Sequence, residues 1–133
     1  TLFYLVIDAK KRSIEWIRAG HEPAWLFDPK KNRFEELKGP GMALGVMEDY
    51  EYGSNHRHQL EKGQVIIVGT DGIWEGHNKA GEMFGKERLQ TLIRSYESSS
   101  ARILLKAVFD EHRRFTQDAR REDDLTMVII KIL

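Results

Sequence analysis

The first residues of the chain alternate between apolar and polar positions with the two-residue period of β-strands. Two apolar runs, residues 2–8 and 13–18, are joined by a polar turn, and in the second run Ile14 and Trp16 fall on the same side. Side chains of a strand alternate between its two faces, so this spacing gives the strand one apolar face. The pattern predicts a β-hairpin.

Short apolar runs continue after the hairpin. Residues 24–27 and 33–37 flank an Asp-Pro turn and predict two more antiparallel strands. Beyond a glycine-containing loop, residues 50–60 predict a long exposed strand. Residues 65–68, Val-Ile-Ile-Val, are apolar without interruption, which is typical of a strand buried on both faces. We therefore expect this strand in the middle of a sheet.

The period lengthens to that of an α-helix in the second half of the chain. Apolar residues recur every three or four positions over residues 85–97 and 99–119, which predicts two amphipathic helices. A serine cluster over residues 98–100 offers hydroxyl oxygens to cap the second helix. A final apolar run over residues 125–132 predicts one more strand. The predicted fold class is α+β, with a mostly antiparallel sheet and both helices packed on one face.

Composition narrows the class of protein. The chain has 133 residues, a length for one domain, with 41% hydrophobic and 32% charged residues, as in soluble globular proteins. Lys plus Arg and Asp plus Glu both total 21, and zero formal charge gives no field to attract nucleic acid or an anionic membrane. The absence of cysteine excludes disulfides, thiolate zinc sites and cysteine nucleophiles. No apolar run approaches the ~20 residues of a membrane-spanning helix, and we expect a cytoplasmic protein.

The end of the predicted central strand carries the first candidate for chemistry. Asp71 follows the buried run 65–68 and is itself followed by Gly72. A carboxylate at the end of a buried strand is held on a rigid base, and the glycine lets the backbone turn away. This arrangement suits a metal ligand. An Asp-Gly pair is also a common turn signal, so a simple turn explains the same residues.

A second acidic group lies just before the last predicted strand. Asp123 and Asp124 are adjacent carboxylates, which repel each other unless water or a cation screens them. A hard divalent ion would relieve the repulsion, and an all-oxygen site favours Mg²⁺ or Mn²⁺ over Zn²⁺. A solvated loop with Arg120 and Arg121 as counter-charges is the alternative.

Aromatic and histidine residues have simpler interpretations. Trp16 and Trp25 have strand spacing and are predicted core side chains, whereas Trp74, three residues after the first acid, is placed to line a cleft. His56 and His58 would share one side of a strand. Without a third ligand nearby, a solvated strand face explains this pair better than a metal site.

Taken together, these segments resemble a known family. Residues 70–75, Thr-Asp-Gly-Ile-Trp-Glu, and residues 81–89, Gly-Glu-Met-Phe-Gly-Lys-Glu-Arg-Leu, are similar to motifs of the PP2C (PPM) superfamily of metal-dependent serine/threonine phosphatases, in its SpoIIE/RsbU-like bacterial branch. Residues 123–126, Asp-Asp-Leu-Thr, resemble its D-D-x-T strand, and residues 19–23 and 41–46 resemble two of its loops. The pieces follow the family's order over nearly the whole chain, which makes the combined match specific.

The resemblance implies a fold, a reaction and a metal site. The family has a sandwich of antiparallel sheets flanked by helices, so a partial PP2C-like sandwich is expected. Two Mn²⁺ or Mg²⁺ ions held by aspartates activate a water that hydrolyses phosphoserine or phosphothreonine. Carried over onto this sequence, Asp71 and Asp123 are metal ligands. Asp124 is expected to support a ligand rather than bind the ion, and Gly72 to let the chain leave the site.

Two motifs of the family are absent from this sequence. Its acidic Gly-Asp segment and its D-x-x-G-H-G-like turn would precede Thr1, and the chain opens directly on a strand that needs a partner. We therefore expect residues 1–133 to be the C-terminal portion of one phosphatase domain whose N-terminal portion is absent. With only part of the ligand set, the chain alone should bind metal weakly and show little activity. Bare sheet surface would favour its self-association.

The resemblance also suggests a biological setting. Members of this branch act on a phosphoprotein, often a small anti-anti-sigma-like (STAS) regulator, and commonly follow sensor or receiver domains in the same polypeptide. Hydrolysis of such a substrate is the leading hypothesis. A non-catalytic module that binds phosphoproteins on the same scaffold is the second. A plain α+β interaction domain, with the two acids in unrelated turns, is the third.

Overall fold

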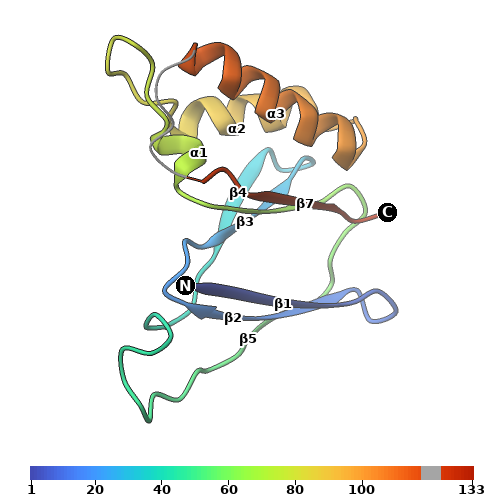
Figure 1. Ribbon diagram of the computed structural model, residues 1–133. Coiled ribbons are helices and arrows are strands. Elements are labelled where there is room, and N and C mark those ends of the chain that lie inside the picture. Colours follow the sequence, from blue (N-terminus) through green and yellow to red (C-terminus); the bar gives the residue numbers. More distant parts are fainter. Residues whose placement is uncertain (118–123) are drawn as a thin grey trace.

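The protein folds into two β-sheets and a layer of helices (Figure 1). The computed structural model describes residues 1–117 and 124–133. In chain order the elements are β1 (Leu2–Asp8), β2 (Ser13–Ala19), β3 (Ala24–Asp28), β4 (Arg33–Leu37), β5 (Asn55–Arg57), β6 (Val65–Gly69), α1 (Gly72–Glu75), α2 (Lys86–Ser95), α3 (Ala101–Thr116) and β7 (Met127–Lys131).

The strands are divided between two antiparallel sheets. One sheet has the order β1-β2-β5, and the other has the order β4-β3-β6-β7. β6 lies between β3 and β7, and Val65 and Ile66 are fully buried. The prediction of a central strand buried on both faces is therefore confirmed.

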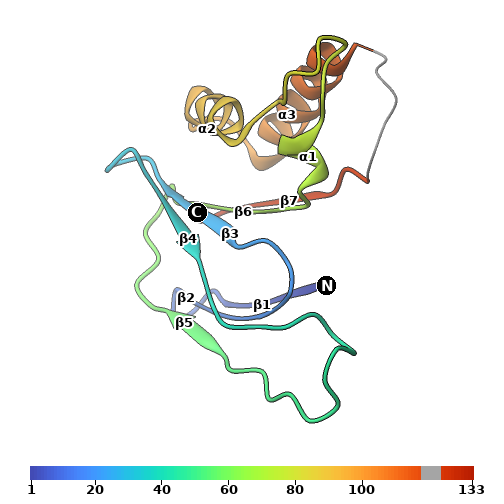
Figure 2. The same ribbon diagram turned by 90° about the vertical axis from the view of Figure 1, so that its left-hand side faces the viewer.

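Two hydrophobic cores separate the layers. Between the sheets, Ile14 and Trp16 of β2 pack with Leu26 of β3 and Ile66 of β6. On the other side of the four-stranded sheet, α2 and α3 cover the strands, as Figure 2 shows. The layers therefore follow one another as sheet, sheet and helices. This is the predicted α+β class with both helices on one face.

Both predicted helices are present, and local signals explain their ends. Gly85, with φ 79°, turns the chain into α2, and the Ser100 hydroxyl accepts a hydrogen bond from the Ile103 N–H at 3.3 Å. Gln117 adopts a left-handed conformation and ends α3. The single turn α1 was not predicted, because four residues are too few to show a helical period. Among the described residues, none of the helices is long and apolar enough to cross a membrane.

The predicted strand over residues 50–60 is wrong for most of its length. Only Asn55–Arg57 pairs, with β2. The Tyr50 and Tyr52 rings contact each other instead, with centroids 4.7 Å apart, and Gln59 has a φ of 60° that a strand does not allow. The chain leaves the sheet there because Leu60 turns into the core between the sheets, where it is 2% exposed.

One face of the three-stranded sheet has no layer over it within the described residues. Leu2, Tyr4 and Val6 lie on this face of β1 and are 44%, 54% and 42% exposed, whereas Phe3 and Leu5 point into the core between the sheets. β1 is also one of the two edge strands of its sheet. We call the surface formed by Leu2, Tyr4 and Val6 the bare face.

A buried acid at the end of β3 links stability to pH. Asp28 is 8% exposed. Burial raises the pKa of its carboxyl group, but hydrogen bonds from the Gln64 side chain at 3.2 Å and the Lys31 backbone N–H at 3.3 Å outweigh burial. With the nearby Lys31 ammonium, they hold the pKa of Asp28 below its ordinary value. The folded protein therefore favours the ionised form.

We expect acid to destabilise the protein partly through Asp28. A carboxyl group with a lowered folded pKa stabilises the fold above its unfolded value of about 3.9, and this contribution is lost as the pH falls through the folded value. Asp28→Asn should cost ~1 kcal/mol at pH 7 and show a weaker loss of stability toward pH 3. Urea unfolding at several pH values measures this, with the exposed Asp49→Asn as the control. An unchanged pH dependence in Asp28→Asn would contradict the assignment.

Candidate metal centre

Asp71 lies where β6 gives way to α1. Its Oδ1 accepts a hydrogen bond from the Gly72 N–H at 3.0 Å, and its carbonyl oxygen accepts one from the Glu75 N–H at 2.9 Å. The carboxylate is half-buried and its orientation is fixed by the turn that it begins. The Asp-Gly pair is thus a helix start, and Gly72 holds the carboxylate as well as turning the chain.

The start of β7 lies beside the end of β6. The antiparallel register pairs Gly69 with Met127. One residue further, the Thr70 N–H donates to the Thr126 carbonyl at 3.0 Å, and the Thr70 hydroxyl accepts from the Thr126 N–H at 3.1 Å. The same hydroxyl donates to the Asp124 carbonyl at 2.9 Å. Thr70 therefore ties the chain just before Asp71 to the backbone of Asp124.

The structure brings Asp71 and Asp124 to the same end of two neighbouring strands. Asp124 is exposed. Asp123, the second predicted ligand, falls in residues 118–123, outside the described residues, and its role stays a prediction. Thr70 was not among the predicted site residues, although it stands next to Asp71 in the sequence. The sequence signal for it is the Thr-Asp-Gly order at the end of a buried strand.

The described residues offer donors of the right type for a hard cation, but too few of them. Carboxylate oxygens suit Mg²⁺ and Mn²⁺. Within residues 1–117 and 124–133, no group of three His, Cys, Asp or Glu side chains is arranged to hold an ion. Mg²⁺ takes about six ligands in octahedral geometry. The site at the end of β6 and β7 therefore fits as part of a metal centre that needs further donors.

The Trp74 ring anchors α1 to the four-stranded sheet. Trp74 is 8% exposed and stacks on Trp25 of β3, with ring centroids 6.0 Å apart. The N–H groups of Phe84 and Gly85 donate to the Gly76 and Trp74 carbonyls, both at 2.8 Å. The expectation that Trp74 lines a cleft is wrong, because its ring is buried in the core under the helices.

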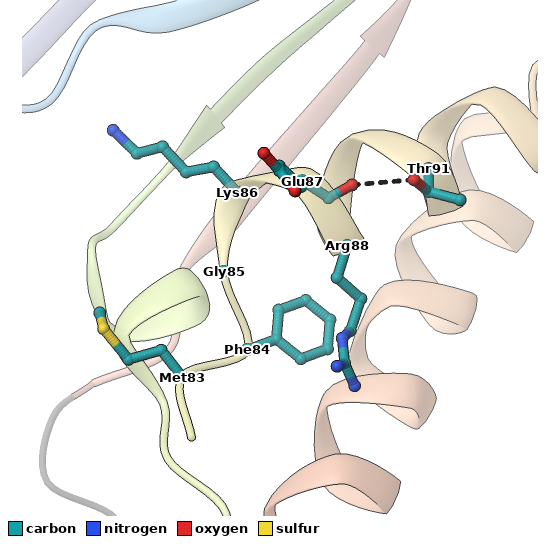
Figure 3. Close-up of a pocket in the computed structure, with 7 residues that line it drawn as sticks. All are labelled: Met83, Phe84, Gly85, Lys86, Glu87, Arg88 and Thr91. Atoms are coloured by element: carbon teal, nitrogen blue, oxygen red, sulfur yellow. Dashed lines mark hydrogen bonds between the residues drawn. The ribbon is translucent and has the colours of Figure 1, made fainter. Parts of the chain in front are cut away.

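An open pocket of about 510 Å³ lies at the start of α2 (Figure 3). It is lined by residues 83–88 and Thr91. Lys86 and Arg88 give it two cationic side chains, and Met83 is half-exposed. Figure 3 shows Lys86 and Arg88 extending in different directions from the first turn of α2. Among the described residues that line the pocket, Asp71 does not appear.

The His56 and His58 rings stack on each other but form no metal site with their neighbours. Their centroids are 6.4 Å apart, and His56 Nε2 lies 3.8 Å from Glu15 Oε1. Both histidines are exposed. In the part of the chain that the structure describes, these three side chains do not form a group that would hold an ion. His56 lies in β5 and His58 follows it outside the strand, so the pair is solvated as predicted but does not form a strand face.

Comparison with known proteins establishes the family. The family model described as Stage II sporulation protein E (SpoIIE) matches residues 1–133. The chain belongs to the SpoIIE family. It is 33% identical over 131 residues to the phosphoserine phosphatase RsbU of Bacillus subtilis (strain 168), an alignment that covers 98% of this chain and 38% of RsbU. The chain thus spans well under half the length of this relative.

Solved structures share the fold of this SpoIIE-family chain. The phosphatase domain of SpoIIE from Bacillus subtilis, presoaked with Mn, matches with a TM-score of 0.72 at 19% identity, over 99% of this chain and 56% of that chain. The SiaA-PP2C domain of Pseudomonas aeruginosa matches with a TM-score of 0.80 at 20% identity, over 96% and 49%. These likenesses show a PP2C-like fold and confirm the expected partial sandwich. The expected family is confirmed by the SpoIIE family model.

Proposed function

We propose that this chain forms the C-terminal portion of a metal-dependent serine/threonine protein phosphatase domain. The observation that carries the proposal is the junction of β6 and β7, where the Thr70 hydroxyl joins the chain next to Asp71 to the Asp124 backbone. Both long helices separate these segments in the sequence. Their meeting at one sheet end argues against two acids in unrelated turns.

Asp71 and Asp123 are the proposed ligands of Mn²⁺ or Mg²⁺. Oδ1 of Asp71 accepts a hydrogen bond from the Gly72 N–H. The other carboxylate oxygen, Oδ2, is proposed to face the ion. Asp124 and Thr70 are proposed to fix the backbone beside the second ligand. Two ions bound there would supply a water of lowered pKa and shield the phosphoryl charge. Water then replaces the serine or threonine oxygen on phosphorus, which yields a free hydroxyl group and inorganic phosphate.

The names of the relatives support this reaction. RsbU is named a phosphoserine phosphatase, and the solved SpoIIE segment is named a phosphatase domain. We infer that the substrate is a regulatory phosphoprotein, with a STAS-like regulator as the first candidate. Sensor or receiver domains in the same polypeptide are proposed to control the activity.

The rest of the domain is proposed to precede this chain. The match covers 56% of the SpoIIE phosphatase-domain chain, which leaves a large part of that domain without a counterpart here. The bare face is the kind of apolar surface that a further layer covers. We infer that the preceding part supplies this layer and the missing ligands. Alone, the chain should self-associate through the bare face and bind Mn²⁺ only in the millimolar range.

The proposal predicts metal-dependent turnover by the full-length protein. With a phosphoserine protein as substrate and Mn²⁺ present, it should release inorganic phosphate, and EDTA should lower the rate at least about a hundredfold. Adding Mn²⁺ back should restore the rate, and residues 1–133 alone should stay near the EDTA level. Colorimetric phosphate detection measures all four conditions. A rate insensitive to EDTA would contradict the metal mechanism.

A non-catalytic phosphoprotein-binding module is the second candidate. It is favoured by the incomplete ligand set among the described residues. Such a module would bind the phosphorylated partner more tightly than the unphosphorylated one, yet release no phosphate with Mn²⁺. Calorimetric binding of both partner forms, followed by the phosphate assay on the same samples, separates the two functions.

A further inference from the structure

We propose that Lys86 is a positioning residue that holds α1, and with it Asp71, from the first turn of α2. The inference rests on the proposed function in one respect, because it takes Asp71 as a metal ligand. Its structural part concerns only how α1 is kept in place.

The Lys86 side chain contacts two segments that are distant in the sequence. Its Nζ lies 4.9 Å from the centroid of the Trp74 ring in α1 and 3.1 Å from Glu22 Oε2, in the loop between β2 and β3. Figure 3 shows this side chain extending away from the axis of α2. One ammonium group therefore connects α1, α2 and the loop that follows β2.

The Trp74 ring is held by aromatic contacts as well as by the cation. It stacks on Trp25 at 24° between ring planes, and Trp25 in turn meets the edge of Phe34 at 5.7 Å. A cation over an indole face is attracted by the ring electrons, more strongly where water is excluded. The ring is 8% exposed and the Lys86 side chain is 42% exposed, so this contact lies at the edge of the core beside solvent.

The position of Trp74 determines the position of Asp71. α1 has only four residues, and a helix of one turn has no stability of its own. Asp71 is joined to this turn by the Gly72 N–H and the Glu75 N–H. A shift of the Trp74 ring therefore moves the carboxylate, and a displacement of about 1 Å weakens a catalytic geometry strongly.

Arg94 provides a matched pair of contacts, and both of its partners lie outside α1. Its guanidinium lies 4.9 Å from the Phe34 ring centroid, and its Nε donates to Asn32 Oδ1 at 2.8 Å. Each of the two cations thus combines one aromatic and one loop contact, at opposite ends of α2. The partners of Arg94 belong to β4 and the turn before it.

The test compares Lys86→Met with Arg94→Met in the full-length protein. Both variants lose a charge and keep an unbranched side chain, so urea unfolding should show similar global stability. Only Lys86→Met should speed hydrogen exchange over residues 70–76, by at least about fivefold. It should also weaken Mn²⁺ binding in calorimetry by at least about fivefold. Lys86→Arg keeps the cation and should restore both values.

Two results would overturn the inference: exchange over residues 70–76 that stays at the wild-type rate in Lys86→Met, or exchange that rises equally in Arg94→Met. Failure of the proposed function looks different. If the wild-type protein neither binds Mn²⁺ nor releases phosphate, the function is wrong, while hydrogen exchange still decides whether Lys86 positions α1. Faster exchange in Lys86→Met with unchanged Mn²⁺ affinity would overturn the link from α1 to the metal ligand.

Discussion

Asp71→Ala should lower Mn²⁺-dependent phosphate release by the full-length protein at least about a hundredfold. The substitution removes a carboxylate from a site that is short of donors among the described residues. It also removes the side-chain oxygen that accepts a hydrogen bond from the N–H of Gly72, the first residue of α1. The assay is phosphate release at saturating Mn²⁺ and again over a Mn²⁺ titration, because a lost ligand also raises the metal concentration required.

Asp71→Asn separates the metal role from the structural one. Asparagine is as good a helix cap as aspartate, so its amide oxygen should keep the contact with Gly72 and leave stability nearly unchanged. Activity should still fall strongly, because a neutral amide is a poor ligand for a hard cation. Asp123→Asn should act in the same direction. Asp110→Ala, which removes an acid paired with Lys106 on α3, is the control and should keep wild-type activity. Wild-type turnover in both Asp71 variants would show that Asp71 is not a metal ligand.

Trp25→Ala should destabilise the protein by about 3–5 kcal/mol, which is typical of truncating a buried tryptophan. Trp25 is 5% exposed and contacts the Trp74 ring at 6.0 Å and the Phe34 ring at 5.7 Å. Its removal leaves a cavity under α2 and takes away the surface on which Trp74 stacks. Urea unfolding followed by circular dichroism measures the loss without depending on tryptophan fluorescence.

Trp25→Phe is the matched variant for this prediction. It keeps an aromatic ring in the stack and removes less volume, so its cost should be less than half that of Trp25→Ala. A loss below about 1 kcal/mol for Trp25→Ala would show that the aromatic stack is not a major part of the core.

The sequence predicted the strands and helices well where a regular period ran for several residues. The apolar runs at residues 2–8 and 65–68 correspond to β1 and β6, because alternation and continuous burial are local signals. The division of the strands into two sheets is not a local property. β3 pairs with β6 although β4 and β5 lie between them in the sequence, and no period along the chain predicts that pairing. The single turn α1 was not predicted either, because four residues are too few to show a helical period.

The candidate site shows the same limit. Asp71 was predicted from its place at the end of a buried strand, and its helix-capping contact agrees with the Asp-Gly order. The bond from the Thr70 hydroxyl to the Asp124 carbonyl spans 54 positions, and only the pairing of β6 with β7 creates it. The contact of Lys86 with Trp74 likewise depends on how α2 crosses the sheet. Sequence motifs thus identified Asp71 and Asp124 as candidates. The pairing of β6 with β7 determined which residues lie beside them.

The position of β7 in the sheet has a consequence for biosynthesis. β6 is complete when residue 69 has been made, yet its partner on one side is formed by Met127–Lys131, after both long helices. Until the ribosome reaches that point, the apolar strand Val65–Gly69 has one edge of unpaired backbone groups. An unpaired strand edge is open to pairing with a strand of another chain. Pairing of Met127–Lys131 with Val65–Gly69 is therefore the step that covers this edge of β6.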